Sequence, residues 1–214
     1  MLYLHVPYED KDEVKKLHAR WDPAKKLWYA TTPKDYYKFR KWISDKTILR
    51  NRLYILDKAM TCWKCKQTAE VYAIGIPDGN IINLYPNESD SRLSKTGLQI
   101  VAPSVGIHVN LMNLLNKNFG LDIRYSKTVK QKYFTNICQN CGATIGDYFV
   151  FAQDFEAPFS LINISDEYEN WSCDAYEVDL RNDYESNVEF TISSNLDIDL
   201  TKKMVVNPDI RFSI

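Results

Sequence analysis

Four of the five cysteines stand in two short C-x-x-C pairs, Cys62 with Cys65 and Cys138 with Cys141. Two such turns that face each other supply four thiolates at about 2.3 Å from a Zn²⁺ ion, which closes a tetrahedral, structural coordination shell. The two halves of a zinc ribbon are usually about 15–20 residues apart. Here residues 66–137 separate them, so the sequence predicts a zinc ribbon that carries a large insertion and clamps a long loop.

The fifth cysteine, Cys173, is expected to lie outside this site. Buried free thiols are the alternative interpretation, because free cysteines are common in protein cores. That alternative does not explain why four of the five fall into two identical spacings. An odd cysteine count with metal-ligand spacing fits a reducing compartment better than a disulfide framework. No run of 18 apolar residues and no basic leader are present, so we expect a cytoplasmic protein without a membrane partner.

The charge of the chain is unevenly distributed, although the formal net charge is only −1. Residues 1–60 carry 14 Lys/Arg against 8 Asp/Glu, residues 61–150 carry 9 against 6, and residues 151–214 carry 4 against 14. Such an asymmetry favours a basic surface in residues 1–150 that faces a polyanion. The acidic module that follows would dock on that surface or elsewhere. Solvated charged faces produce milder versions of the same asymmetry by chance.

The first 45 residues predict a β-α-β-β-α unit. Apolar alternation predicts a strand that ends at Pro7, and acidic residues then crowd the first turn of a helix, where the helix dipole favours them. Pro23 presets a turn between two strands, and Pro33 occupies the tolerated first position of a second helix. The expected elements are a strand at residues 2–6, a helix at 9–17, strands at 20–21 and 27–30, and a helix at 33–43.

Motifs in this unit are V-P-Y at residues 6–8, K-D-E at 11–13, A-R-W-D-P at 19–23 and W-Y at 28–29. Together they make residues 2–43 resemble a small bacterial domain family of unassigned function. That family occurs alone and beside primase-like and other DNA-processing modules on plasmids and mobile elements. The chain departs from the family at His18, where Gly is commoner. The resemblance implies a context near nucleic acid rather than a reaction.

The remainder of the chain mixes strands and one long helix. Residues 44–61 are interpreted as a connecting segment with some helical spacing, and residues 86–97 as a loop. A strand at 71–76 is expected to turn at 77–80 and to pair back with residues 81–84 as a hairpin. Residues 107–119 have the spacing of a buried helix, which Gly120 closes. Alternation predicts strands with one wet, acidic face at residues 176–180, 188–192 and 196–200.

A second set of motifs surrounds the later cysteine pair: R-Y-S-K-T at residues 124–128, C-Q-N-C-G at 138–142 and G-D-Y-F at 146–149. This run resembles the zinc-knuckle region that accompanies the same small domain in some bacterial proteins. The fold class expected from both parts is α+β. It comprises a basic, aromatic-rich β-α-β-β-α domain (1–48), a zinc-ribbon domain with an inserted α/β lobe (49–152) and a strand-rich acidic part (153–214) that could form one domain with the zinc ribbon.

No motif for nucleotide hydrolysis, dinucleotide binding, zinc proteolysis or a serine nucleophile is present. The three histidines are scattered, and a closed four-thiolate zinc offers no open position for an activated water. Asp197 and Asp199 alternate onto one strand face, where they could bind a divalent cation, but solvated strand charges are far commoner. The sequence therefore favours a protein without enzymatic activity.

Cations interleaved with flat aromatic residues are the best candidate for binding, because phosphates attract the cations and unpaired bases stack on the rings. The predicted nucleic-acid contacts are Arg20, Lys25, Lys26, Lys34, Lys38, Arg40, Lys41, Lys64, Arg124 and Lys127. The alternative for Trp21, Trp28 and Trp42 is the core of the small domain, and we expect that alternative to hold for all three.

These observations favour a zinc-stabilised, non-enzymatic nucleic-acid-binding accessory protein of a bacterium or mobile element. The alternative is a protein-interaction module with a purely architectural zinc, in which the acidic tail engages a basic partner. A metal-dependent nuclease that uses tail carboxylates is a distant third.

Overall fold

The computed structural model describes residues 1–85, 97–103, 107–152, 157–160, 164, 169–187 and 199–214. Helices and strands are mixed along the chain, which confirms the α+β class. Within these ranges no helix combines the length and the apolar character that crossing a membrane requires.

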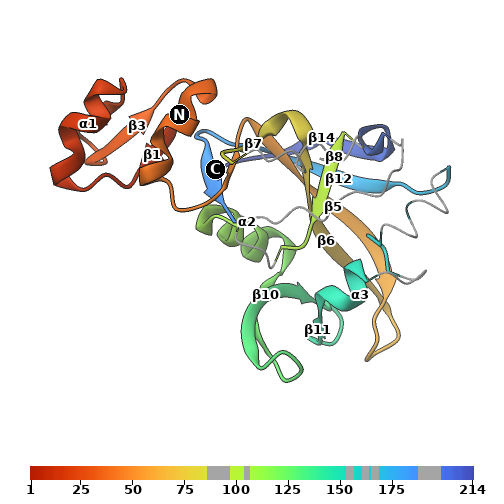
Figure 1. Ribbon diagram of the computed structural model, residues 1–214. Coiled ribbons are helices and arrows are strands. Elements are labelled where there is room, and N and C mark those ends of the chain that lie inside the picture. The colour runs from red at the N-terminus through yellow and green to blue at the C-terminus, as the bar shows by residue number, and fades with distance from the viewer. Residues whose placement is uncertain (86–96, 104–106, 153–156, 161–163, 165–168, 188–198) are drawn as a thin grey trace.

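A small antiparallel sheet and short helical segments form the N-terminal unit at one end of the molecule (Figure 1). Its elements are β1 (Leu2–Leu4), η1 (Tyr8–Asp10), α1 (Lys11–Lys16), β2 (Arg20–Asp22), β3 (Leu27–Ala30) and η2 (Pro33–Trp42). The predicted element order is confirmed, but the second helix is a 3-10 helix. Its buried side chains, Tyr36, Phe39 and Trp42, recur every third residue, which matches the three residues per turn of a 3-10 helix.

The three tryptophans of this unit have different environments. Trp42 is buried in the core, as expected, whereas Trp28 is half-buried and Trp21 is 47% exposed. Leu4, Trp28 and Trp21 are cross-strand partners in one row of the sheet. The hydrophobic core cluster of the unit contains Leu4 and packs against Trp28, but it does not include Trp21. The prediction that all three are core residues is therefore wrong for Trp21 and only partly right for Trp28.

A five-stranded sheet forms the centre of the molecule. In spatial order its strands are β14 (Met204–Ser213), β12 (Cys173–Asp179), β5 (Arg52–Thr61), β6 (Thr68–Pro77) and β8 (Leu98–Val101). The connecting segment predicted at residues 44–61 is wrong, because it contains β4 (Thr47–Leu49) and β5. The apolar run Leu53, Ile55 and Leu56 resembles helical spacing because the middle strand of the sheet is buried on both faces: Leu53 and Ile55 lie in one hydrophobic cluster and Leu56 in another.

A second sheet of short strands links this centre to the N-terminal unit. It has the order β13 (Tyr184–Ser186), β4, β7 (Ile81–Asn83). The turn predicted at 77–80 is present as η3 (Asp78–Asn80), but β7 pairs with β4 and not with β6. The hairpin prediction is wrong in its pairing, because β8 already occupies the free edge of β6 at Ile74 to Pro77.

The predicted buried helix is confirmed as α2 (Val109–Phe119), which ends at Gly120 with a left-handed φ of 69°. Leu111, Leu114 and Leu115 of this helix belong to the same hydrophobic cluster as Ile55 and Ile74. The chain continues through β9 (Asp122–Ser126), β10 (Gln131–Ile137), β11 (Thr144–Ile145) and α3 (Asp147–Phe151), below the central sheet in Figure 1.

The acidic segment is part of the central sheet. Its strand predicted at 176–180 is confirmed by β12, which pairs with β5 on one side and β14 on the other. The loop expected at 86–97 and the strands expected at 188–192 and 196–200 fall almost entirely outside the described residues. Near the end, η5 (Leu200–Lys203) precedes β14. The division of the chain into three domains stays a prediction.

The segment around β13 also contacts the N-terminal unit. The Tyr36 hydroxyl donates a hydrogen bond to Asp183 at 2.6 Å, and the backbone N–H of Ser44 donates one to Glu185 at 2.7 Å. Asp183 and Glu185 of the acidic part therefore contact the basic N-terminal part of the chain through a tyrosine hydroxyl and a backbone N–H.

Candidate metal centre and basic aromatic surfaces

The four paired cysteines come together at the end of the β5–β6 hairpin. The sulfur of Cys62 lies 3.8 Å from that of Cys141, and the sulfur of Cys65 lies 3.8 Å from that of Cys138. All four sulfurs lie within 4.8 Å of one another. Thiolates bound at about 2.3 Å by a tetrahedral ion are about 3.8 Å apart, so this cluster could hold a metal ion.

Both C-x-x-C turns have the same backbone geometry. The N–H of Lys66 donates to the carbonyl of Cys62 at 3.0 Å, and the N–H of Gly142 donates to the carbonyl of Cys138 at 2.9 Å. Lys66 and Gly142 both adopt a left-handed conformation, with φ of 62° and 68°. The two halves are therefore equivalent turns, although only the second has the glycine that this conformation favours.

Backbone groups favour the thiolate form of one of the four cysteines, Cys62. The N–H groups of Cys65 and Lys64 stabilise the Cys62 thiolate and lower the pKa of that thiol to about 6. Several thiolates packed this closely repel one another unless a positive ion neutralises them. Cys173 is different: it lies outside the cluster in β12, where burial raises the pKa of its thiol to about 12.

Side-chain amides anchor the second cysteine turn to the open edge of β6. Asn136 accepts from the N–H of Tyr72 at 2.8 Å and donates to its carbonyl at 3.1 Å. Gln139 makes the same pair of bonds with Glu70, and Asn140 donates to the carbonyl of Thr68. β8 pairs with β6 only from Ile74 to Pro77. On the same edge of β6, at Thr68 to Tyr72, these amides make hydrogen bonds that a neighbouring strand would otherwise make. Sequence reasoning missed them, although three amide residues within residues 136–140 were the available signal.

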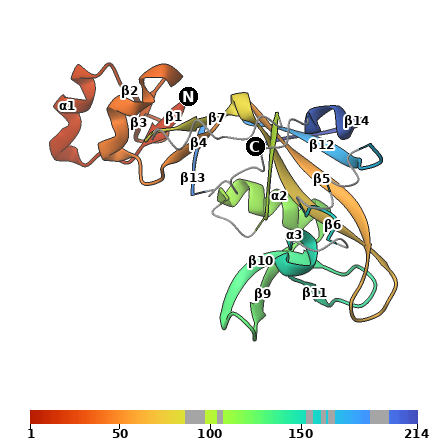
Figure 2. The ribbon, with the colours of Figure 1, turned by 45° about the vertical axis from the view of Figure 1, so that its right-hand side comes forward.

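The predicted basic residues form two groups rather than one surface. Arg20, Lys25, Lys26, Lys34, Lys38, Arg40 and Lys41 belong to the N-terminal unit, while Lys64 lies in the first cysteine turn, Arg124 in β9 and Lys127 in the turn between β9 and β10. The N-terminal unit lies at one end of the molecule, away from β10 and the turn of the β5–β6 hairpin (Figure 1 and Figure 2). Because β5 has ten residues and a strand rises about 3.4 Å per residue, this strand alone spans about 30 Å.

Some of these cations have acidic partners. Lys38 pairs with Asp35 at 2.7 Å, Lys41 pairs with Glu13 at 2.7 Å and with Asp10 at 3.1 Å, and Arg124 pairs with Asp122 at 3.2 Å. The guanidinium of Arg40 lies 4.8 Å from the centroid of the Tyr85 ring. The six others are exposed and form no ion pair within the described part of the chain: Arg20, Lys25, Lys26, Lys34, Lys64 and Lys127.

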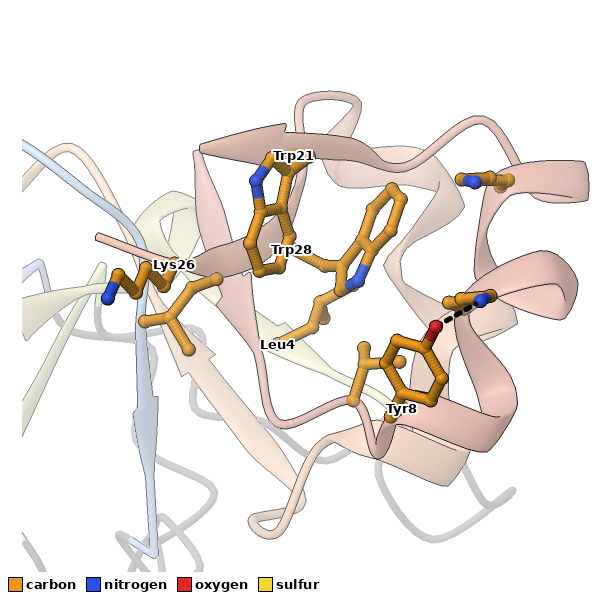
Figure 3. Close-up of a pocket in the computed structure, with 9 residues that line it drawn as sticks. Leu4, Tyr8, Trp21, Lys26 and Trp28 are labelled. Atoms are coloured by element: carbon orange, nitrogen blue, oxygen red, sulfur yellow. Dashed lines mark hydrogen bonds between the residues drawn. The ribbon is translucent and has the colours of Figure 1, made fainter. Parts of the chain in front are cut away.

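The N-terminal unit also has an open pocket of about 490 Å³ on the face of its sheet that carries Trp21 and Trp28. Figure 3 shows Trp21 and Trp28 in its middle, with Tyr8 towards one end and Lys26 at the other. Tyr8, Lys11 and Lys15 line it as well, and the sequence analysis did not place them in a site.

The similarities to known proteins described below lie in the N-terminal unit. Residues 1–44 match the family model of a domain of unknown function (DUF5710), which confirms the resemblance in that stretch. Two proteins of Escherichia coli, each named DNA primase TraC, are 50% and 48% identical over 40 residues, or 19% of this chain. Those 40 residues span only 4% and 3% of the two primases. No solved structure matches the chain.

Proposed function

We propose that this protein is a non-enzymatic nucleic-acid-binding accessory protein of a bacterium or mobile element, whose fold is stabilised by a structural zinc ion. The main observation in favour of this proposal is a set of six exposed cations that form no ion pair with the described residues. Four of them lie in the N-terminal unit. Cations that no acidic side chain neutralises are available to phosphates, and their contacts release counterions.

Zinc is the proposed metal because the donor set consists of four thiolates. Soft thiolate ligands in a tetrahedral arrangement favour zinc or iron–sulfur chemistry. Here the Cys62–Cys141 and Cys65–Cys138 distances match a single ion. With four protein ligands the shell is closed, so the ion would tie the β5–β6 hairpin to the turn between β10 and β11. It would have no position for a substrate.

The two E. coli proteins are named as DNA primases, and they share the N-terminal stretch with this chain. That similarity supports a nucleic-acid context for the N-terminal unit. It does not assign the activity of a primase to this chain, because the match covers so little of either primase.

The protein-interaction alternative, in which the acidic tail engages a basic partner, has less support. Asp183 and Glu185 already bond to the N-terminal unit, and Glu177 pairs with Arg52 and Arg211 within the central sheet. These carboxylates are engaged within the chain itself.

Titration of labelled single-stranded DNA, duplex DNA and RNA with the zinc-loaded protein at two salt concentrations tests the proposal. Binding that weakens as salt rises supports it. Absence of binding to all three probes at low salt would exclude it and favour the protein-interaction alternative.

A further inference from the structure

We infer that the pocket of the N-terminal unit holds one unpaired nucleotide of a nucleic-acid strand. The base would lie against the rings of Trp21, Trp28 and Tyr8, and the flanking phosphates would lie at the lysines on either side. This inference rests on the proposed function, because it names the part of a nucleic acid that the N-terminal unit takes.

The pocket has the dimensions and lining of a ligand site. Its volume of about 490 Å³ lies within the range of small-molecule pockets. Leu4, Val6 and Leu27 form an apolar part of the lining. None of the described residues that line it carries a carboxylate, so nothing in this lining repels an anionic ligand.

The rings of the pocket are more exposed than core packing explains. Tyr8 is 76% exposed and Trp21 is 47% exposed. The Trp21 and Trp28 rings lie 5.4 Å apart between centroids and are tilted by 59°, so they form a wedge rather than a closed stack. Large exposed rings beside cations are the surface on which single-stranded nucleic acids stack their bases.

Lysines lie on both sides of these rings. Near one end, Lys11 donates a hydrogen bond to the Tyr8 hydroxyl at 2.7 Å, and the ammonium of Lys15 is 5.7 Å from the centroid of the Trp28 ring. Lys26 lies at the opposite end, beyond Trp21 (Figure 3). A nucleotide within a strand has a phosphate on each side of its sugar, so this arrangement of charge matches it.

The end of the pocket at Lys26 is formed before any ligand binds. Asp22 accepts hydrogen bonds from the backbone N–H groups of Ala24 and Lys25, at 2.9 and 3.1 Å. The turn then places Lys26 in a left-handed conformation with φ of 55°. Among the described residues, the only acidic partner of a pocket lysine in an ion pair is Asp12, 3.6 Å from Lys15. Because both side chains are exposed, that pair is weak and a phosphate can replace it.

An unpaired base fits this pocket better than a base pair does. Inside a duplex, the faces of each base are covered by its neighbours, so only the phosphates are available to the protein. In a single strand the base can leave the stack and lie against an aromatic ring. The pocket therefore predicts a preference for single strands that depends on bases as well as on charge.

Three DNA probes of equal length separate these contributions: a single strand, the corresponding blunt duplex and an abasic single strand, which keeps the phosphates and lacks the bases. Each is titrated with the full-length protein and with the variants Tyr8→Ala and Trp21→Ala. Tyr148→Ala is the matched control, because Tyr148 is 70% exposed and lies outside the pocket.

We expect the single strand to bind more tightly than the abasic strand and the duplex. Each of the two ring variants should lose about 5- to 150-fold in affinity for the single strand, the range that stacking of one base on a protein ring provides. The control should bind as the unchanged protein does. Equal binding of the single and abasic strands, or unchanged binding by both ring variants, would contradict the binding of a nucleotide in the pocket. Either result would leave the proposal of nucleic-acid binding intact. Failure of these DNA probes and of an RNA strand of equal length to bind would overturn both proposals.

Discussion

The side-chain amide of Gln139 makes both hydrogen bonds that a neighbouring strand would make to Glu70, accepting from its N–H at 3.1 Å and donating to its carbonyl at 2.9 Å. Asn136 does the same for Tyr72. The second cysteine turn is therefore attached to the central sheet by its side chains as well as by any metal ion, and the two attachments can be tested separately.

Asn136→Ala should destabilise the fold by about 2–4 kcal/mol. Asn136 is only 1% exposed, so its removal leaves the N–H and the carbonyl of Tyr72 without hydrogen-bond partners at a buried position. Denaturant unfolding measures this free energy. Asn113→Ala on the exposed face of α2 is the control and should be nearly neutral. A destabilisation by Asn136→Ala no larger than that of the control would show that water satisfies the edge of β6 without the amide.

Cys138→Ser should lower both metal content and stability. We expect one zinc ion per chain in the unchanged protein and a loss of several kcal/mol in the variant, because the free energy of binding structural zinc is part of the free energy of folding. Metal analysis together with thermal unfolding provides the measurement. Cys173→Ala should keep the full zinc content, since Cys173 lies outside the cluster. A metal-free protein purified without chelators would refute the metal centre.

Two glycine substitutions should have different effects on the free energy of unfolding. Gly142→Ala should cost about 1 kcal/mol, because φ at this residue is 68° and no heavy atom of the described residues lies close enough to add a clash. Gly79→Ala should be neutral or stabilise the fold by up to about 1 kcal/mol, because its φ is ordinary and its surroundings are open. Equal effects of the two substitutions on the unfolding free energy would argue against the knuckle geometry.

Asp57 should make stability depend on pH. Burial, assisted by a hydrogen bond with Glu70, raises the pKa of the Asp57 carboxyl from 3.8 to about 7. Between these values the folded protein keeps a proton that the unfolded chain has released, so stability should fall as pH rises from about 4 to about 7 and then level off.

Asp57→Asn removes this dependence. The variant should be more stable than the unchanged protein by about 1–2 kcal/mol at pH 8, after allowance for solvent screening, and the difference should vanish near pH 4. Unfolding curves at several pH values measure it. Asp209→Asn, an exposed position, should show no such trend, and a gain at Asp57 that is independent of pH would argue against a raised pKa.

The cluster of four cysteines was predictable because the sequence contains them in two pairs with the spacing of metal ligands. The β-α-β-β-α order was predictable for a similar reason, since Pro7, Pro23 and Pro33 mark its boundaries locally. Sheet pairing was not predictable in the same way. Ile81 and Ile82 follow a tight turn after β6, yet β7 pairs with β4 because β8 occupies the edge, and no local signal encodes that competition.

Burial was harder to predict than secondary structure. Trp21 and Trp42 are both large apolar residues of one small domain, but only Trp42 is in its core. The core cluster of the unit contains Trp42 but does not include Trp21. Likewise, the charge of the acidic segment indicated docking, whereas the actual contacts of Asp183 and Glu185 are with Tyr36 and with the backbone.

The position of β12 also determines how the tail can be tested. Since β12 lies between β14 and β5, removal of residues 151–214 would take two strands from the central sheet and unfold the protein. Point substitutions in the full chain are therefore the appropriate test.

Lys38 and Lys41 are poor choices for a substitution that tests phosphate binding, because both already pair with carboxylates.

The salt dependence of nucleic-acid binding tests the central proposal most directly. The affinity of the zinc-loaded protein for a single-stranded DNA should be measured across a salt series, for the unchanged chain and for a triple variant with Arg20→Gln, Lys26→Gln and Lys34→Gln. Lys117→Gln, an exposed position on α2, is the control. If the three cations bind phosphates, the triple variant should bind more weakly, and the slope of log affinity against log salt should flatten by roughly 0.7 for each phosphate that is no longer neutralised. An unchanged affinity and slope in a folded triple variant is incompatible with nucleic-acid binding by the N-terminal unit.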